Sequence, residues 1–188
     1  MTPDRQQPLT EEAQAAVEVF LRDHGAARMP HPGGTLLEHL LRVQLLLAEW
    51  EADPAVQTAG LCHATYGTDG FAPALLPLTE RATLVALIGE PAESLVYLYA
   101  GCDRATVYPR IDGTTAVAFR DRFTGREHHP SPADLRAFLE ITAANEIDVL
   151  THNAELAEQH GPALYGFLQR AGALLSPAAQ DAVARQQA

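Results

Sequence analysis

Helix-start signals recur along the chain, and they limit the possible folds more than any other sequence feature. Thr10 is followed by two acids, so a capping hydroxyl precedes negative charges that stabilise a first helical turn. Asp53-Pro54 and Ser131-Pro132 each combine a capping side chain with a proline at the first helical position. Apolar residues at helical spacing follow these signals. The sequence therefore predicts a mainly α-helical protein.

Breaks in the apolar periodicity divide the chain into separate helices. Their expected ranges are 10–25, 35–51, 54–66, 79–88, 91–101, 133–159, 162–173 and 177–186. In the second of these, Glu38 and Arg42 have the spacing of an i,i+4 ion pair. The chain has 188 residues and shows no low-complexity linker, so residues 1–188 are expected to form one domain, a helical bundle.

Residues 105–122 follow a different period. Apolar and β-branched residues alternate with polar ones on both sides of Asp112-Gly113, a dipeptide typical of two-residue hairpin turns. This pattern predicts that residues 105–111 pair with residues 114–122. The bundle is therefore expected to carry one small β-hairpin.

The composition argues against several classes of protein. A net charge of −11 disfavours nucleic-acid binding, which depends on basic side chains, and the absence of lysine excludes Schiff-base chemistry and a P-loop. No run reaches the ~18 apolar residues of a membrane span, and residues 1–12 lack the pattern of a signal peptide. We therefore expect a cytoplasmic protein without a membrane segment. Cys62 and Cys102 are expected to be buried free thiols.

Two histidines lie on faces that the helical pattern buries. His39 falls on the apolar stripe of the helix over 35–51, and His63 lies on the apolar face near the end of the next helix. A buried imidazole needs a hydrogen-bond partner or a metal ion, because a desolvated polar group without one is costly. Taken singly, each could be a core histidine bonded to a backbone carbonyl.

The expected helix over 133–159 is apolar on two sides, and its second apolar face surrounds Asn145 and Asp148. One reading is that this face is simply solvated. If both sides are buried instead, the Asp148 carboxylate requires a cation. His39, His63 and Asp148 on three neighbouring helices would then form a set of two histidines and one carboxylate, which suits Zn, Mn or Fe.

A family resemblance rests on four fragments, LLEHLL, AGLCHATYGT, IGEPAESLVYLY and FTGREHHPSPADL. With His39 and His63 on successive helices and Asp148 on a late helix, the region from about residue 31 to residue 152 resembles the HD-domain superfamily. It is similar in particular to a small, functionally uncharacterised bacterial HD-like family. The resemblance implies an HD-domain-like helical bundle in which His39, His63 and Asp148 bind a divalent metal ion.

The chain departs from that superfamily directly after His63. HD domains are named for an adjacent His-Asp pair whose aspartate binds metal, whereas Ala64 follows His63 here. Dinuclear members that resemble inositol oxygenase use two further histidines on intervening helices. Between His63 and Asp148 only His128 and His129 occur, in an expected loop. A dinuclear site is therefore not expected, which leaves one divalent ion (Zn, Mn or Fe) or a site that has lost its metal.

Three further residues are candidates for catalysis. His31 lies in the loop before the His39 helix and could face the same cavity, although loop residues more often lie on the surface. Tyr66 and Asp69 follow His63 closely and could line the mouth of that cavity.

The resulting hypothesis is a metal-dependent HD-like enzyme that acts on a small molecule, as a hydrolase with a metal-activated water. His31 or Asp69 would transfer the proton. Most HD domains act on phosphate esters, so the resemblance implies an anionic substrate. Four arginines could bind an anion or could simply be solvated: Arg104, Arg110, Arg120 and Arg122. The alternatives are a non-catalytic ligand-binding protein that has lost its metal, and a mononuclear iron oxygenase.

Overall fold

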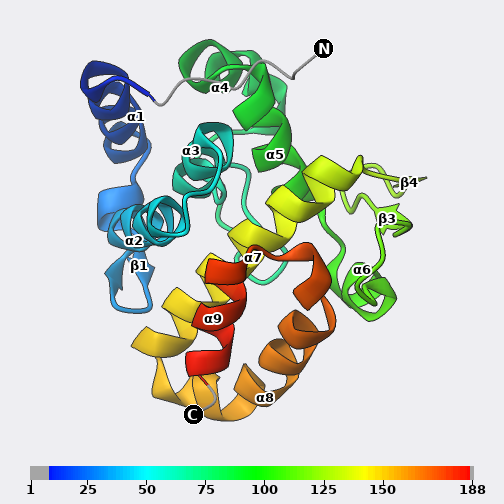
Figure 1. Ribbon diagram of the computed structural model, residues 1–188. Coiled ribbons are helices and arrows are strands. Elements are labelled where there is room, and N and C mark those ends of the chain that lie inside the picture. Colours follow the sequence, from blue (N-terminus) through cyan, green and yellow to red (C-terminus); the bar gives the residue numbers. More distant parts are fainter. Residues whose placement is uncertain (1–8, 187–188) are drawn as a thin grey trace.

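The computed structural model describes residues 9–186 and is mainly helical (Figure 1). Its α-helices in this range are α1 (Glu11–Asp23), α2 (Leu36–Glu49), α3 (Pro54–Cys62), α4 (Arg81–Ile88), α5 (Glu90–Gly101), α6 (Arg104–Val107), α7 (Pro132–His152), α8 (Ala154–Arg170) and α9 (Pro177–Arg185). Short 3-10 turns cover Ala26–Arg28, Leu78–Glu80, Tyr108–Arg110 and Gly172–Leu174. The strands are β1 (Pro30–His31), β2 (Gly34–Thr35), β3 (Phe119–Arg120) and β4 (Glu127–His128).

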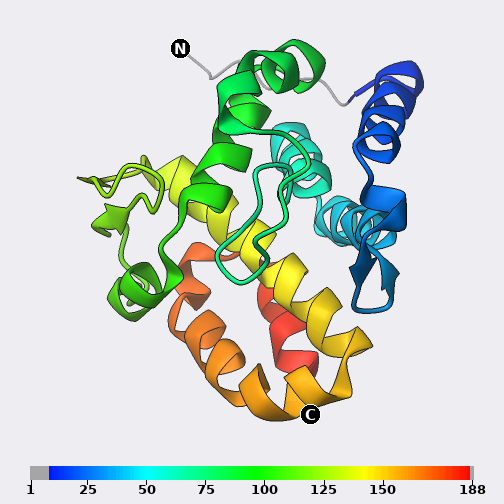
Figure 2. The same cartoon turned by 180° about the vertical axis from the view of Figure 1, so that it is seen from behind.

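Helix α7 passes through the middle of the molecule and contacts helices on both sides (Figures 1 and 2). α2, α3 and α5 pack against it on one side, and α8 and α9 on the other. Its buried residues include Leu135 and Ile147 from one expected apolar face, and Phe138 and Ile141 from the other. Of the two readings of this helix, with its second apolar face solvated or buried, the structure shows burial on both sides. Such burial brings Asp148 into the interior.

The predicted capping residues begin their helices. The Thr10, Asp53 and Ser131 side chains accept hydrogen bonds from the backbone of the first turns of α1, α3 and α7. At the start of α2, Thr35 and Glu38 form a reciprocal capping box, in which each side chain bonds the other residue's backbone N–H. Glu38 is therefore turned toward Thr35, and Arg42, its expected ion-pair partner, binds Asp148 instead.

The predicted helix over 133–159 ends earlier, at His152. Asn153 leaves the helical conformation, and its side-chain oxygen accepts from the Leu156 backbone N–H at 3.0 Å. Asparagine bonds its own neighbouring backbone in this way, which favours a cap over helix continuation. α8 therefore starts at Ala154 and contains Pro162, which the sequence placed at a helix start.

The predicted pairing of residues 105–111 with residues 114–122 is wrong. The Asp103 side chain accepts from the Thr106 backbone N–H at 3.0 Å and so begins α6, which overlaps the start of the expected first strand. The alternating apolar residues are buried nonetheless, although they lie in helical and extended segments and not in paired strands. The antiparallel pairs are β1 with β2 and β3 with β4, so β3, which lies within the expected second strand, pairs with residues 127–128 instead of residues 105–111.

The loop between α3 and α4 crosses over α7 (Figure 2) and encloses part of a cavity described below. Cys62 and Cys102 are buried free thiols, as expected. Among residues 9–186, no helix is long and apolar enough to cross a membrane. The expectation about a signal peptide rests largely on residues 1–8, which lie outside the described residues.

Candidate functional site

Three histidines meet between α2, α3 and the β1–β2 hairpin. His39 on α2 is fully buried, and the His31 ring from β1 stacks on it with ring centroids 4.0 Å apart. His63 is the C-terminal cap of α3, where its ring meets His39 edge-on. The two Nε2 atoms of His39 and His63 are 3.4 Å apart. The sequence prediction that these two histidines are neighbours is therefore confirmed.

The outer nitrogens of these two rings are already occupied. His39 Nδ1 lies 2.6 Å from Asp148 Oδ2, and His63 Nδ1 lies 2.7 Å from the Gly60 carbonyl oxygen. A carboxylate and a carbonyl can only accept, so both Nδ1 atoms carry hydrogen and donate. If the rings are neutral, each Nε2 atom therefore carries a lone pair, and the two Nε2 atoms face each other.

Asn145 on α7 adds a third acceptor at the same point. Its Oδ1 is 3.2 Å from His39 Nε2, while its Nδ2 donates to Glu146 Oε1 at 3.2 Å. The Glu146 carboxylate therefore turns the amide oxygen, not the amide nitrogen, toward the histidines. Within the described residues, no donor lies among these three acceptors when both rings are neutral. Such a group favours a cation or a hydrogen-bond donor at this point.

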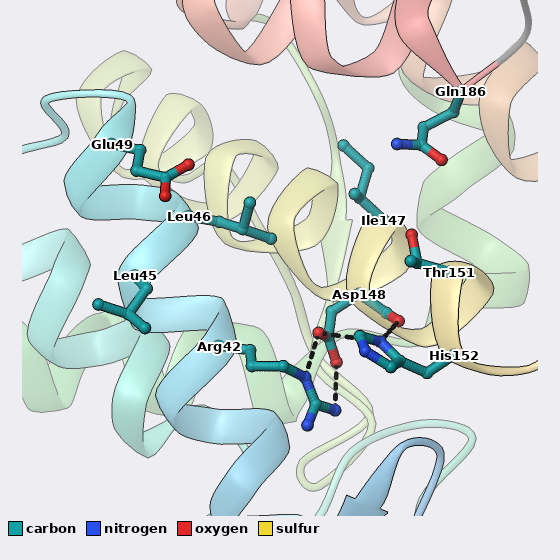
Figure 3. A pocket seen from close by; sticks show the side chains of 9 residues that line it. All are labelled: Arg42, Leu45, Leu46, Glu49, Ile147, Asp148, Thr151, His152 and Gln186. Carbon is teal, nitrogen blue, oxygen red and sulfur yellow. Dashed lines mark hydrogen bonds and ion pairs between the residues drawn. The ribbon is translucent and has the colours of Figure 1, made fainter.

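Asp148 lies beside the histidines but on the opposite edge of the His39 ring from Nε2. Arg42 on α2 binds both oxygens of Asp148, with Nε donating to Oδ1 at 2.6 Å and Nη2 to Oδ2 at 3.0 Å (Figure 3). Burial raises the pKa of Asp148, but hydrogen bonds from His39 and Arg42 outweigh it and hold that pKa below its usual value. The structure thus brings together the three expected ligands, and Asp148 orients His39 rather than converging with the two Nε2 atoms.

Arg42 also fixes the segment that carries His31. Its Nη2 donates to the Pro32 carbonyl at 3.0 Å and its Nη1 to the Gly33 carbonyl at 3.3 Å. Gly33 has a φ of 79°, which only glycine adopts readily, and a side chain there would collide with His152. One guanidinium therefore joins α2, α7 and the β1–β2 turn.

A cavity of about 200 Å³ opens beside the histidines, between α7 and the loop after α3. Its walls include His31, His63, Asn145, Arg104 and Glu146. Ala64, which follows His63 in the sequence, lies in the same wall.

Burial shifts two of the cavity histidines toward the neutral form. Burial and the neighbouring His39 lower the pKa of His63 to about 3 and that of His31 to about 4. His31 Nδ1 is buried and has no hydrogen-bond partner among the described residues. Near neutral pH both rings are therefore neutral, and His31 has a free polar atom in an enclosed site.

The structure does not bring Tyr66 or Asp69 to this cavity. The Tyr66 hydroxyl donates to Glu93 at 2.8 Å, in a buried group completed by Arg81, and burial and that carboxylate raise the Tyr66 pKa. Asp69 accepts from the Arg104 backbone N–H at 2.8 Å and so anchors the start of α6. Both side chains have structural partners, which does not fit their expected catalytic roles.

A larger cavity, of about 370 Å³, lies on the other side of Asp148 (Figure 3). It runs between α2 and α7, with Arg42 and Asp148 at one end and Leu45 and Leu46 along its wall. Arg42 already makes four hydrogen bonds, so little of its donor capacity faces this cavity. The polar groups that remain available for binding or catalysis therefore lie mainly in the smaller cavity.

A conventional metal centre is not evident. Within residues 9–186, no three His, Cys, Asp or Glu side chains are arranged to hold one metal ion. The convergent set identified above differs because its third member is the amide oxygen of Asn145. Sequence reasoning placed Asn145 on the correct helix face but gave it no role. Its spacing of three residues from Asp148 is the signal that it shares that face.

The comparisons with known proteins leave the function open. Residues 20–104 are similar to a family model described as a domain of unknown function (DUF6817). That segment includes the three histidines and Arg104, but not Asn145 or Asp148. No curated protein and no solved structure matches the chain.

Proposed function

We propose that the chain is a divergent HD-like enzyme that hydrolyses a small molecule with one bound divalent ion. The ion would be held by His39 Nε2, His63 Nε2 and Asn145 Oδ1. One observation carries the proposal: His63 Nε2 and Asn145 Oδ1 lie 3.4 and 3.2 Å from His39 Nε2, and in neutral rings none of these three buried atoms is a donor. The arrangement of His39, His63 and Asp148 on α2, α3 and α7 supports the proposed HD-like relationship.

The spacing of the two histidine nitrogens fits this role. Two nitrogens bound at ~2.0–2.1 Å to the same tetrahedral ion lie ~3.3–3.4 Å apart. The two Nε2 atoms are separated by 3.4 Å. Metal-binding histidines also donate their other N–H to a carboxylate or a backbone carbonyl, and Asp148 and Gly60 provide those partners. Imidazole with an amide oxygen is compatible with Zn, Mn or Fe.

Different residues of the chain would have different roles in the proposed hydrolysis. When bound, a divalent ion supplies Lewis acidity and lowers the pKa of a water ligand. Asp148 and the Gly60 carbonyl hold the two rings with Nε2 toward the cavity. His31, neutral near pH 7 and in the wall of the cavity, would accept the proton from the attacking water and return it to the leaving group. The loop after α3 limits the entry of bulk water.

Metal content and turnover test this proposal together. The protein is purified without chelator, and bound Zn, Mn and Fe are measured alongside hydrolysis of 4-nitrophenyl acetate and 4-nitrophenyl phosphate. We expect about one ion per chain and metal-dependent turnover of at least one ester. His63→Gln and Asn145→Ala should remove both properties, whereas His128→Gln, in exposed β4, should change neither. Metal-free protein that stays inactive after addition of Zn or Mn would contradict the proposal.

A metal-free ligand-binding protein is the second candidate, and two observations favour it. Ala64 replaces the aspartate of the HD pair, and Arg42 already neutralises Asp148. In that case His39 carries two protons and donates to Asp148 and to Asn145. Nitrogen-15 NMR of the histidine rings at neutral pH separates the two, because the metal-bound His39 has one protonated nitrogen and the metal-free one has two. Bound iron with oxygen consumption would instead indicate an oxygenase.

A further inference from the structure

Arg104 is the permanently charged cation among the residues that line the smaller cavity. It begins α6, and its backbone N–H is fixed by Asp69. Its side chain is 22% exposed and packs near the rings of Tyr99 and Tyr108, at 5.5 and 5.8 Å from their centroids. The guanidinium is thus held in the cavity wall rather than extended into solvent.

The hydrogen bonds of this guanidinium are incomplete. Nη1 donates to Glu146 Oε1 at 3.2 Å, and Nη2 donates to the Tyr99 hydroxyl at 3.0 Å. A guanidinium has five N–H groups, so the remaining three have no partner among the described residues. Donors in a largely enclosed site are normally satisfied, by protein, water or ligand. A planar anion that accepts two parallel N–H bonds would satisfy most of them.

The charge and size of the cavity restrict that anion. Glu146 lies beside Arg104 and offsets its charge, and no second arginine lines the cavity within residues 9–186. A single negative charge therefore fits this place better than a phosphate dianion. A volume of about 200 Å³ corresponds to roughly seven water molecules, which limits the ligand to a small molecule. Gly70, in the same wall, lies close to this guanidinium, since an added Cβ there would be 3.9 Å from Arg104 Nη1.

We propose that the substrate of this cavity is a small carboxylic acid, anchored through its carboxylate by the Arg104 guanidinium. Arg104 holds the carboxylate while the scissile group lies beside His63 and His31 in the same cavity. The statement that the bound carboxylic acid is hydrolysed rests on the proposed function. Carboxylate binding itself requires only Arg104, so it can be measured without metal.

The test uses full-length protein from which metal and chelator have both been removed. Binding of propionate, its neutral analogue propionamide and inorganic phosphate is followed by calorimetry. We expect propionate to bind, and both other probes to bind about tenfold more weakly or not at all. Arg104→Gln should weaken propionate binding about tenfold or more, as expected for loss of a charge-assisted bond. Arg120→Gln, an arginine with a 48% exposed side chain, should leave it unchanged.

A second measurement covers the case in which Arg104→Gln fails to fold. In wild-type protein with nitrogen-15 arginine, propionate should shift the side-chain resonances of Arg104 and leave those of Arg120 in place. The proposal is overturned if phosphate binds as tightly as propionate, if propionamide matches propionate, or if Arg104 does not respond. None of these outcomes depends on metal or turnover, so the hydrolase proposal could fail while this one holds.

Discussion

Arg42→Ala should destabilise the protein more than any ordinary surface substitution. The guanidinium of Arg42 donates twice to the buried Asp148 carboxylate and once each to the Pro32 and Gly33 carbonyls. Removing one partner of a buried ion pair costs ~3–5 kcal/mol, because the other charge is left without compensation. At ~2–4 °C per kcal/mol for a chain of this size, the melting temperature should fall by ~6–20 °C.

A double-mutant cycle shows whether this cost arises from the contact with Asp148. Unfolding of the wild type, Arg42→Ala, Asp148→Asn and the double variant is followed by circular dichroism in urea. Because the two residues act on each other, the double variant should lose much less stability than the sum of the single changes, by ~1–3 kcal/mol. Arg126→Ala, at an exposed position in the segment between β3 and β4, serves as the control and should change stability by less than ~0.5 kcal/mol.

Either of two results would show that Arg42 does not stabilise the fold through Asp148. One is an Arg42→Ala protein as stable as Arg126→Ala. The other is additivity of the two single substitutions within ~0.3 kcal/mol, which would mean that Arg42 and Asp148 do not stabilise each other. In either case the description of Arg42 as the link between α2, α7 and the His31 segment would have to be abandoned.

Two further predictions concern positions outside the cavity. Asp121→Asn should cost ~1.5–3 kcal/mol at neutral pH, since Asp121 accepts from the Tyr97 hydroxyl and the Phe123 backbone. Burial raises the Asp121 pKa, but these hydrogen bonds outweigh burial and hold the pKa below its ordinary 3.8. The stability that Asp121 contributes is therefore complete above pH 3.8 and is lost as the pH falls through the folded-state pKa. Urea titrations should show that the difference in free energy of unfolding between wild type and Asp121→Asn is smaller at pH 3 than at pH 7. A difference that is the same at both pH values would contradict this prediction. Asn153→Ala should cost ~0.5–2 kcal/mol through loss of the α8 cap, and an unchanged urea midpoint would show that this cap does not matter.

Local signals explain which parts of the fold were predictable. The Thr35, Asp53 and Ser131 caps act on residues within one turn, so the sequence places the starts of α2, α3 and α7 correctly. The hairpin prediction failed because alternating burial does not by itself require strand pairing. Asp103 caps a short helix there, and the apolar residues still reach the core. Asn153 was read as an interior helix residue, although its side chain can end one helix and start the next.

The candidate site was predictable in its members but not in their orientation. Helical spacing put His39 and Asp148 on buried faces, and they do meet. The partner of Arg42 lies 106 residues away, whereas the pattern offered Glu38 within the same helix. Which edge of a ring faces a carboxylate depends on such tertiary contacts. The sequence could therefore not distinguish a metal-binding Asp148 from one that orients His39.

Anomalous diffraction tests directly whether a metal ion binds between His39, His63 and Asn145. Crystals soaked in Zn²⁺ or Mn²⁺ would be measured on both sides of the absorption edge of the metal. We expect one peak at ~2.0–2.2 Å from the Nε2 atoms of His39 and His63 and from Asn145 Oδ1, with Asp148 still bonded to His39 Nδ1. No peak between the two rings, or a peak on Asp148 with Arg42 displaced, would contradict it.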